Sequence, residues 1–184
     1  MIKIIAFLGP SGSGKSTLQN LLGYKPIITW TSRQPRLGET NGIHYNFATR
    51  DQILNMHKEG LLLEYTEYNG NLYGTGLDSI KKLIDSNDYG SIVVDANGAE
   101  KLKNKFPDSV LIIGVIAPYE ECKENLIKRK DKNTKERLST YSDEITSVMN
   151  LSDIIINNSK SNWEKSCNIL KVFKTGMQKH KKEK

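Results

Sequence analysis

Nine residues near the N-terminus, Gly9-Pro10-Ser11-Gly12-Ser13-Gly14-Lys15-Ser16-Thr17, constrain this chain more than any other stretch. They fit the phosphate-binding pattern G-x-x-x-x-G-K-[ST], which joins a buried strand to the start of a helix. Residues 2–8 form an apolar run of strand length, and Leu18, Leu21 and Leu22 recur at helical spacing after the loop. The sequence therefore predicts a strand, a glycine-rich loop and a helix in that order.

The loop has the chemistry that a nucleotide polyphosphate needs. Glycines let the backbone wrap around phosphates, and the helix N-terminus adds the positive end of its dipole. Lys15 is expected to reach the β- and γ-phosphates, and the Ser16 hydroxyl to join the shell of a Mg²⁺ ion. A glycine-rich turn that happens to contain a lysine is the alternative. The loop residues predicted to bind the nucleotide are Gly9, Ser11, Gly12, Ser13, Gly14, Lys15, Ser16 and Thr17.

Length, charge and cysteine content narrow the class of protein. The 184 residues suit one compact domain with a small inserted lobe, and the net charge of +6 suits a protein that gathers anionic nucleotides. No apolar run reaches the roughly 18 residues of a membrane span, and the N-terminal run lacks a signal-peptide cleavage site. Cys122 and Cys167 suggest neither a metal site nor a disulfide framework, which favours a cytoplasmic setting. The basic tail at residues 179–184 is expected to be solvated, and a charge run alone gives little reason to expect a nucleic-acid partner.

The remaining chain alternates strand and helix patterns around one irregular section. Residues 43–73 break into short runs separated by turn signals such as Asn69-Gly70-Asn71, which indicates a small inserted lobe. The apolar run at residues 110–116 is typical of a parallel strand covered on both faces. The prediction is a three-layer α/β core. Its strands are expected at residues 27–30, 91–95, 110–116 and 153–157, and its helices at 50–57, 77–84, 99–105, 119–128, 135–150 and from Trp163 to just before Gly176.

A polar stretch from Thr31 to Phe47 is the second informative segment. Arg33 and Arg36 lie three residues apart around Pro35, in a loop too polar for a core. Because guanidinium groups bind phosphate through two parallel hydrogen bonds, the pair suggests a second anion site. Two solvated surface arginines are the alternative.

Taken together, these segments resemble guanylate kinase, a family of P-loop nucleoside monophosphate kinases. The resemblance rests on GPSGSGKST, TSRQPRLGETNGIHYNF, LLEYTEYNGNLYGT and the stretch from Asp95 to Ala99, and it extends over nearly the whole chain. It implies a P-loop NTPase core with a mostly parallel sheet, an inserted α+β lobe for the monophosphate and a helical lid. The implied bounds within a single domain of residues 1–184 are 1–31, 77–118 and 141–184 for the core, 32–76 for the lobe and 119–140 for the lid.

The resemblance also implies roles for individual residues. Arg33, Arg36, Tyr45 and Tyr73 would hold the acceptor phosphate, although the two tyrosines could equally be core aromatics of the lobe. Arg129 and Arg137 would close over the transferred phosphoryl group from the lid, unless they are ordinary helix-surface arginines. Asn158 would lie near the donor adenosine. The full set implied to bind GMP is Thr29, Arg33, Arg36, Glu39, Tyr45, Glu64, Tyr73, Thr75 and Asp95, with Glu39 and Asp95 orienting the arginines and the acceptor or the metal shell.

Guanine chemistry agrees with three of these assignments. The base offers N1–H and N2–H donors, which the Glu64 carboxylate can accept, and an O6 acceptor, which a Thr29 or Thr75 hydroxyl can meet. Adenine reverses this edge, and mismatched buried polar groups reject a wrong substrate by about 10⁴-fold in well-built sites.

The implied reaction transfers the γ-phosphoryl group of ATP, with Mg²⁺, to GMP and also to dGMP, since no assigned residue reads the 2′-hydroxyl. The acceptor phosphate has a second pKa of about 6, so no general base is required. Lys15, Arg129 and Arg137 are the expected catalytic residues, acting by positioning and charge neutralisation.

Three positions depart from the family pattern. Asn125 replaces a further lid arginine, Val93 replaces an acidic residue, and Asn97 replaces a glutamine, which puts the lid's charge and the outer shell of the metal in doubt. Two other functions stay open: a P-loop kinase for another phosphorylated acceptor such as a ribose phosphate, and a non-catalytic guanylate-kinase-like binding module. A monomer and a homodimer are both compatible with the sequence.

Overall fold

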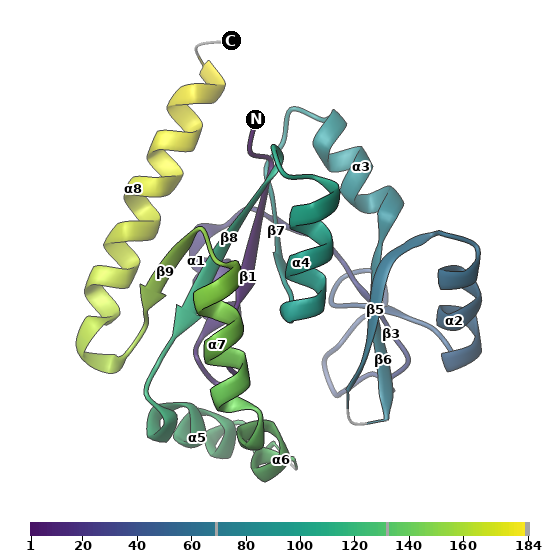
Figure 1. Ribbon diagram of the computed structural model, residues 1–184, viewed down its shortest axis with the longest axis horizontal. Helices are drawn as coiled ribbons and strands as arrows, with labels where there is room; N and C mark the ends of the chain where they lie inside the picture. Colours follow the sequence, from purple (N-terminus) through teal and green to yellow (C-terminus); the bar gives the residue numbers. More distant parts are fainter. Residues whose placement is uncertain (69, 132, 183–184) are drawn as a thin grey trace. The chain divides into compact units, whose positions relative to one another are not determined.

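The computed structural model describes residues 1–68, 70–131 and 133–182. Asn69 of the predicted turn and residues 183 and 184 of the basic tail lie outside the described residues. By its contacts the chain forms two compact units, residues 1–6 with 25–111 and residues 7–24 with 112–184. A five-stranded sheet has the order β2-β7-β1-β8-β9 and a four-stranded sheet the order β4-β3-β6-β5 (Figure 1). The predicted α/β class with a mostly parallel central sheet is confirmed.

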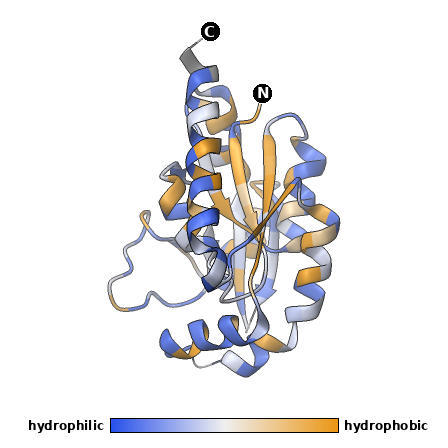
Figure 2. Cartoon of the chain, turned by 90° about the vertical axis from the view of Figure 1, so that its left-hand side faces the viewer, coloured by the Kyte–Doolittle hydropathy of each residue, from blue (hydrophilic) through white to orange (hydrophobic). Residues whose placement is uncertain are grey.

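The strands of the five-stranded sheet are short and apolar. They are β1 (Ile4–Leu8), β2 (Lys25–Pro26), β7 (Gly90–Val93), β8 (Val110–Ile116) and β9 (Ile154–Asn157). The five residues of β1 are all buried, and β2 pairs with β7, and β8 with β9, in parallel. Figure 2 shows the strands as the most hydrophobic part of the chain and the helices as largely hydrophilic. The continuous apolar runs in the sequence therefore do mark the central strands.

The four-stranded sheet belongs to the first unit and lies in the section that the sequence predicted to be irregular. Its strands are β3 (Trp30–Thr31), β4 (Asn46–Phe47), β5 (Leu62–Tyr68) and β6 (Asn71–Gly76). Strands β5 and β6 form an antiparallel hairpin, and β3 pairs antiparallel with β6. Helix α2 (Arg50–Lys58) packs on this sheet through a small core of Ile53, Leu62 and Leu72. The same unit contains α3 (Leu77–Asp85) and α4 (Ala96–Lys105).

Residues 27–30 do not form the predicted strand. Strand β2 ends at Pro26, although the Ile27 N–H still donates to the Ser91 carbonyl at 2.8 Å, and β3 begins at Trp30 in the other sheet. The chain thus leaves one sheet and enters another within a single apolar run. Hydrophobicity does not distinguish these two cases, because both sheets bury the same kinds of side chain.

The second unit contains the remaining helices of the described chain. They are α1 (Lys15–Leu22), α5 (Tyr119–Lys128), α6 (Thr134–Ser139), α7 (Tyr141–Leu151), the 3₁₀ turn η1 (Lys160–Asn162) and α8 (Trp163–Lys182). Helices α1 and α8 contact each other, and α6 contacts both α5 and α7 (Figure 1). The core shared by α5, α6 and α7 is a cluster of Ala117, Cys122, Leu126 and Leu138, with Tyr141 packed against it.

Two helix predictions need correction. The helix expected at residues 135–150 is two helices, α6 and α7, separated at Thr140. The break allows Leu138 to join the core cluster, a tertiary requirement that helical spacing cannot express. The last helix continues through Gly176 to Lys182, because one glycine costs a helix only about 1 kcal/mol and good helix formers follow it.

Among the described residues, no helix combines the length and the apolar character that crossing a membrane requires.

Leu72→Ala tests the core of the four-stranded sheet. Leu72 is fully buried and packs with Ile53 and Leu62, so truncation leaves a cavity and should lower the free energy of unfolding by about 2–5 kcal/mol. Urea denaturation followed by circular dichroism measures the loss. Leu37→Ala is the matched control, because Leu37 is fully exposed and its truncation should change stability by less than about 0.5 kcal/mol. Equal losses in both variants would contradict this description of the core.

Candidate functional site

The loop between β1 and α1 has a backbone that only glycine allows at three positions. Gly9, Gly12 and Gly14 have φ angles of 150°, 86° and 94°. A Cβ atom at Gly9 would lie 2.1 Å from the Val115 carbonyl oxygen, and one at Gly12 would lie 2.4 Å from the Cys122 carbonyl oxygen. At Gly14 it would lie 2.3 Å from the side-chain nitrogen of Asn158. The backbone of this loop, here called the cradle, is therefore packed so closely against its surroundings that only glycine fits at these positions, as is common in loops that bind polyphosphates.

Lys15 lies inside this cradle and donates to the loop's own backbone. Its Nζ contacts the Gly9 carbonyl at 2.5 Å and the Pro10 carbonyl at 2.9 Å. Burial lowers the pKa of Lys15 to about 8, while the Glu144 carboxylate opposes that shift. Ser16 and Thr17 begin α1 with exposed side chains, and no side chain in the described chain caps this helix N-terminus. The helix dipole and the lysine therefore both favour an anion here.

Three side chains from separate elements hold consecutive residues of the loop. The Ser11 N–H donates to the Glu144 carboxylate at 3.2 Å. The Asn125 amide donates to the Gly12 carbonyl at 2.8 Å, and the Asn158 amide donates to the Ser13 carbonyl at 2.9 Å. The sequence predicted a donor-site role for Asn158, treated Asn125 only as a departure, and missed Glu144. The one feature of the sequence that could have indicated Glu144 is helical spacing. Residue 144 lies three residues after Tyr141 and four before Val148, and therefore on the same face of the helix.

Two buried polar atoms of the loop region lack a partner. The Ser13 hydroxyl and the Asn158 side-chain oxygen are buried and make no hydrogen bond with any described residue. Buried polar atoms are normally satisfied, so these two fit a ligand or water that accompanies the bound nucleotide. Together with the glycine cradle and the exposed Ser16 hydroxyl, they make the site suitable for a nucleotide with its Mg²⁺ ion.

The two arginines predicted to belong to a lid both act electrostatically on Lys15. Arg137, on α6, forms an ion pair with Asp131 at 2.7 Å, and Arg129 ends α5 with an exposed side chain. Both positive charges act on Lys15 and help lower its pKa. The structure thus brings the three predicted catalytic residues into one electrostatic environment.

Arg33 and Arg36 are held by one carboxylate in the first unit. Glu39 accepts a hydrogen bond from the Arg33 guanidinium at 2.8 Å with one oxygen, and from the Arg36 backbone N–H at 2.8 Å with the other. The hydrogen bond from Arg33 holds the pKa of the Glu39 carboxyl below its usual value. The Arg36 side chain is exposed. This arrangement fixes the direction of Arg33 and leaves Arg36 available to an incoming anion.

Two tyrosines complete the arginine cluster. The Arg33 guanidinium lies over the Tyr45 ring, 5.5 Å from its centroid, and Tyr45 packs edge-on against Tyr73 with centroids 6.2 Å apart. The strands explain the proximity, because β3 pairs Thr31 with Tyr73 and Ser32 continues with backbone and side-chain hydrogen bonds to Leu72.

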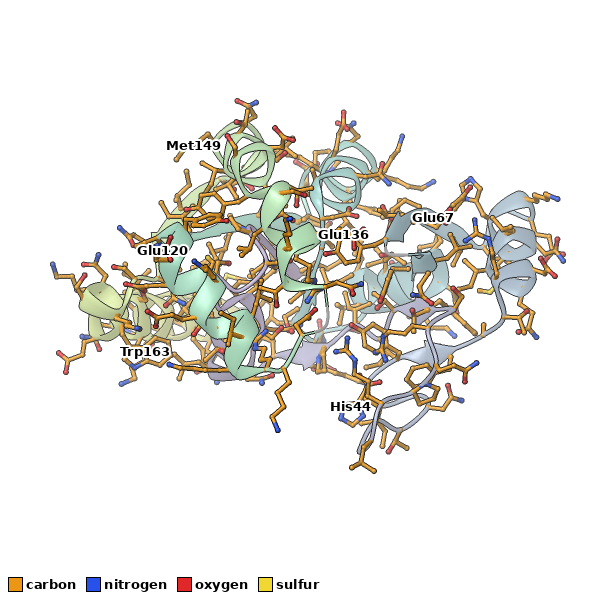
Figure 3. All side chains as sticks on the ribbon, turned by 90° about the horizontal axis from the view of Figure 1, so that it is seen from below. His44, Glu67, Glu120, Glu136, Met149 and Trp163 are labelled. Carbon is orange, nitrogen blue, oxygen red and sulfur yellow. The ribbon has the colours of Figure 1, made fainter. Side chains whose placement is uncertain are left out.

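His44 lies in the same loop (Figure 3). Its Nδ1 accepts a hydrogen bond from the Thr40 N–H at 3.0 Å, so this histidine closes a turn. This contact gives His44 a structural role in the loop.

Glu64 is a buried carboxylate in a polar environment. It faces Thr75 across the β5–β6 hairpin and accepts hydrogen bonds from the Thr75 hydroxyl and backbone, and from the Thr66 hydroxyl. Asn97 of α4 approaches the same carboxylate at 3.5 Å and donates to the Thr66 hydroxyl at 3.3 Å. Burial raises the pKa of Glu64 to about 7, and the nearby Asp95 charge adds to the shift.

The other two residues implied in GMP binding occupy ordinary structural positions. Asp95 is the N-cap of α4 and accepts from the Gly98 N–H at 2.8 Å. Thr29 is half-buried between β2 and β3, and its carbonyl accepts from the Asn46 N–H at 2.8 Å. Its side-chain hydroxyl is not used in that bond.

The predicted site residues divide cleanly between the two units. Every residue predicted for the donor nucleotide or the lid belongs to residues 7–24 or 112–184, and every residue predicted for the acceptor belongs to residues 25–111. Each unit thus contains one of the two predicted sets of binding residues.

Similar proteins are known along most of this chain. The sequence profile described as guanylate kinase matches residues 1–175. The chain belongs to the guanylate kinase family. It is 31% identical over 168 residues to a guanylate kinase of Shouchella clausii strain KSM-K16, with 87% of this chain and 82% of the relative aligned. Identity to a guanylate kinase of Desulfitobacterium hafniense strain Y51 is 33% over 162 residues, covering 84% and 81%.

Solved structures match the fold of this guanylate kinase chain. A crystal structure of guanylate kinase from Anaplasma phagocytophilum has a TM-score of 0.72 at 24% identity, covering 94% of this chain and 86% of that one. A shikimate kinase from Acinetobacter baumannii, in complex with shikimate, has a TM-score of 0.50 at 13% identity, covering 96% and 95%. Both likenesses concern the fold alone.

Gly12→Ala tests the cradle. The added methyl group would overlap the Cys122 carbonyl at a φ angle that disfavours alanine, so ATP affinity should fall at least about 100-fold. Isothermal titration calorimetry measures the affinity. Gly176→Ala is the matched control, because a methyl group there meets nothing within 4 Å inside α8 and should leave ATP binding unchanged. ATP binding by Gly12→Ala at the parent's affinity would contradict the cradle.

Proposed function

We propose that this guanylate kinase transfers the γ-phosphoryl group of ATP to GMP or dGMP through the donor and acceptor residues described above. The observation that carries the proposal is Glu64, a buried carboxylate opposite Thr75 in the unit that also contains the Arg33–Glu39 pair. A base-reading carboxylate and a phosphate-binding arginine in one unit suit a purine monophosphate.

Glu64 and two threonines would select guanine. The ionised carboxylate accepts the N1–H and N2–H groups of guanine, and a hydroxyl of Thr75 or Thr29 donates to O6. Thr75 is buried and its hydroxyl donates to the Glu64 carboxylate. A bound guanine would replace this hydrogen bond with bonds to the base. Adenine would leave these buried groups mismatched, which is the strongest form of rejection available to such a pocket.

The arginine cluster would bind the acceptor phosphate. Arg33 is held by Glu39 and stacked on Tyr45, so little side-chain entropy is lost when it meets the phosphate. Arg36 is exposed and gains its fixed position only with the anion. The phosphate oxygens are largely ionised at neutral pH and need no general base to attack.

The donor half would work by positioning and charge. Lys15 would exchange the carbonyls of Gly9 and Pro10 for the β- and γ-phosphates, and the Ser16 hydroxyl would join the Mg²⁺ shell. The Mg²⁺ ion, when bound, neutralises charge on the phosphates. Arg129 and Arg137 would add positive charge on the transferred group from the proposed lid, residues 119–140, and would exclude water as it closes.

The remaining predictions concern setting and assembly. A cytoplasmic monomer or homodimer is proposed, with the free thiols of Cys122 and Cys167 suited to a reducing compartment. Neither a kinase for a ribose phosphate nor a non-catalytic module is favoured, because such proteins would have no use for the buried Glu64 and the glycine cradle together.

A coupled assay of ADP formation tests the function. With ATP and Mg²⁺, GMP and dGMP should be phosphorylated, and AMP should react at least about 10⁴-fold less efficiently. Absence of ADP with both guanine nucleotides would refute the proposal, and equal use of AMP would refute the role of Glu64.

Two variants separate the half-sites in the same assay. Lys15→Ala should lower kcat at least about 100-fold, because it removes charge stabilisation of the transferred group. Arg33→Ala should chiefly raise the KM for GMP, by about tenfold or more, through loss of charge-assisted hydrogen bonds.

The pH dependence tests Glu64 separately. Its pKa of about 7 lies above the ordinary value, so the carboxylate is protonated below pH 7 and ionised above it. Because guanine requires the ionised form, kcat/KM for GMP should rise as pH increases from 6 to 8, with a midpoint near 7. Glu64→Gln should keep only the step from the GMP phosphate, near about pH 6. A parent profile without the step near 7 would contradict this role.

A further inference from the structure

We propose that Glu144, on α7, is a positioning residue of the donor site: its carboxylate fixes the backbone of the phosphate loop at Ser11. This inference rests on the proposed donor role of the loop. It assigns a function to a residue that neither the loop pattern nor the lid arginines include.

Glu144 is one of three side chains that hold the phosphate loop in place. Three consecutive loop residues are held from outside, and two of the holders are neutral amides, Asn125 and Asn158, which donate to backbone carbonyls. Glu144 differs from both, because it accepts from a backbone N–H at 3.2 Å and carries a charge. Glu144 is therefore the one carboxylate among these three supports, and a carboxylate can accept a charge-assisted hydrogen bond. It also links the first half of the loop directly to α7.

Asp143 provides a matched comparison. Both acids lie in the first turn of α7, where each favours the positive end of the helix dipole. Asp143 is exposed, and Glu144 is half-buried against the loop. Asp143→Asn and Glu144→Gln remove the same charge from the same turn, so any effect on the helix itself should be common to both.

The test measures the dissociation constant of ATP with Mg²⁺, by calorimetry, at pH 7.5. Glu144→Gln should weaken ATP binding about tenfold. Glu144→Ala should weaken binding further, since glutamine keeps an acceptor for Ser11 and alanine does not. The KM for GMP should be unchanged in both, and Asp143→Asn should match the parent throughout. Melting temperatures show whether each variant is folded.

Two results would overturn the inference: Glu144→Gln with the parent's affinity for ATP, or Asp143→Asn with the same loss of affinity as Glu144→Gln. Lys15→Ala keeps this outcome separate from the proposed function. If Lys15→Ala binds ATP as the parent does, the donor site itself is wrong. If Lys15→Ala weakens ATP binding and Glu144→Gln does not, only the role of Glu144 fails.

Discussion

The close approach of the phosphate loop to its surroundings is the constraint on which the donor half of this protein depends. The backbone at Gly9, Gly12 and Gly14 comes so near to β8, α5 and Asn158 that a single methyl group would displace it. This closeness lets the loop carbonyls and amides be held by side chains from other elements, and it buries Lys15 among them. The second unit is therefore arranged around a backbone path that only glycine can follow.

Lys15 in one unit and Glu64 in the other share one property, a charge disfavoured by burial. Lys15 and Glu64 are each shifted toward neutrality by burial, to pKa values of about 8 and about 7. Each is thus poised to gain stabilisation from an incoming partner of complementary character, a polyphosphate for the lysine and guanine N–H donors for the carboxylate. Arg33 differs from both, because its charge is already paired. Glu39 forms an ion pair with its partly exposed guanidinium, which also lies over the Tyr45 ring.

The hydrophobic pattern of the sequence predicted a helix or strand correctly where the whole element packs in a single environment. The strand at residues 110–116 and the helix at residues 119–128 begin and end where expected, because a continuous apolar run and a regular helical face each report a single environment. The predictions at residues 27–30 and 135–150 were wrong where one pattern spans two environments. A change of sheet at Trp30 and a helix break at Thr140 are set by what the chain must pack against.

Sequence alone predicted the phosphate loop and the arginine pair, and its resemblance to guanylate kinase predicted the family and a guanine-reading role for Glu64. Those features depend on residue types at fixed spacing, and both can be read directly from the amino-acid sequence. Only the tertiary structure decided that Glu144 and Asn125 hold the loop, that Asp131 pairs with Arg137, and that burial shifts Lys15 and Glu64. Hydrogen bonds and desolvation depend on distance between residues far apart in the chain, which no local pattern records.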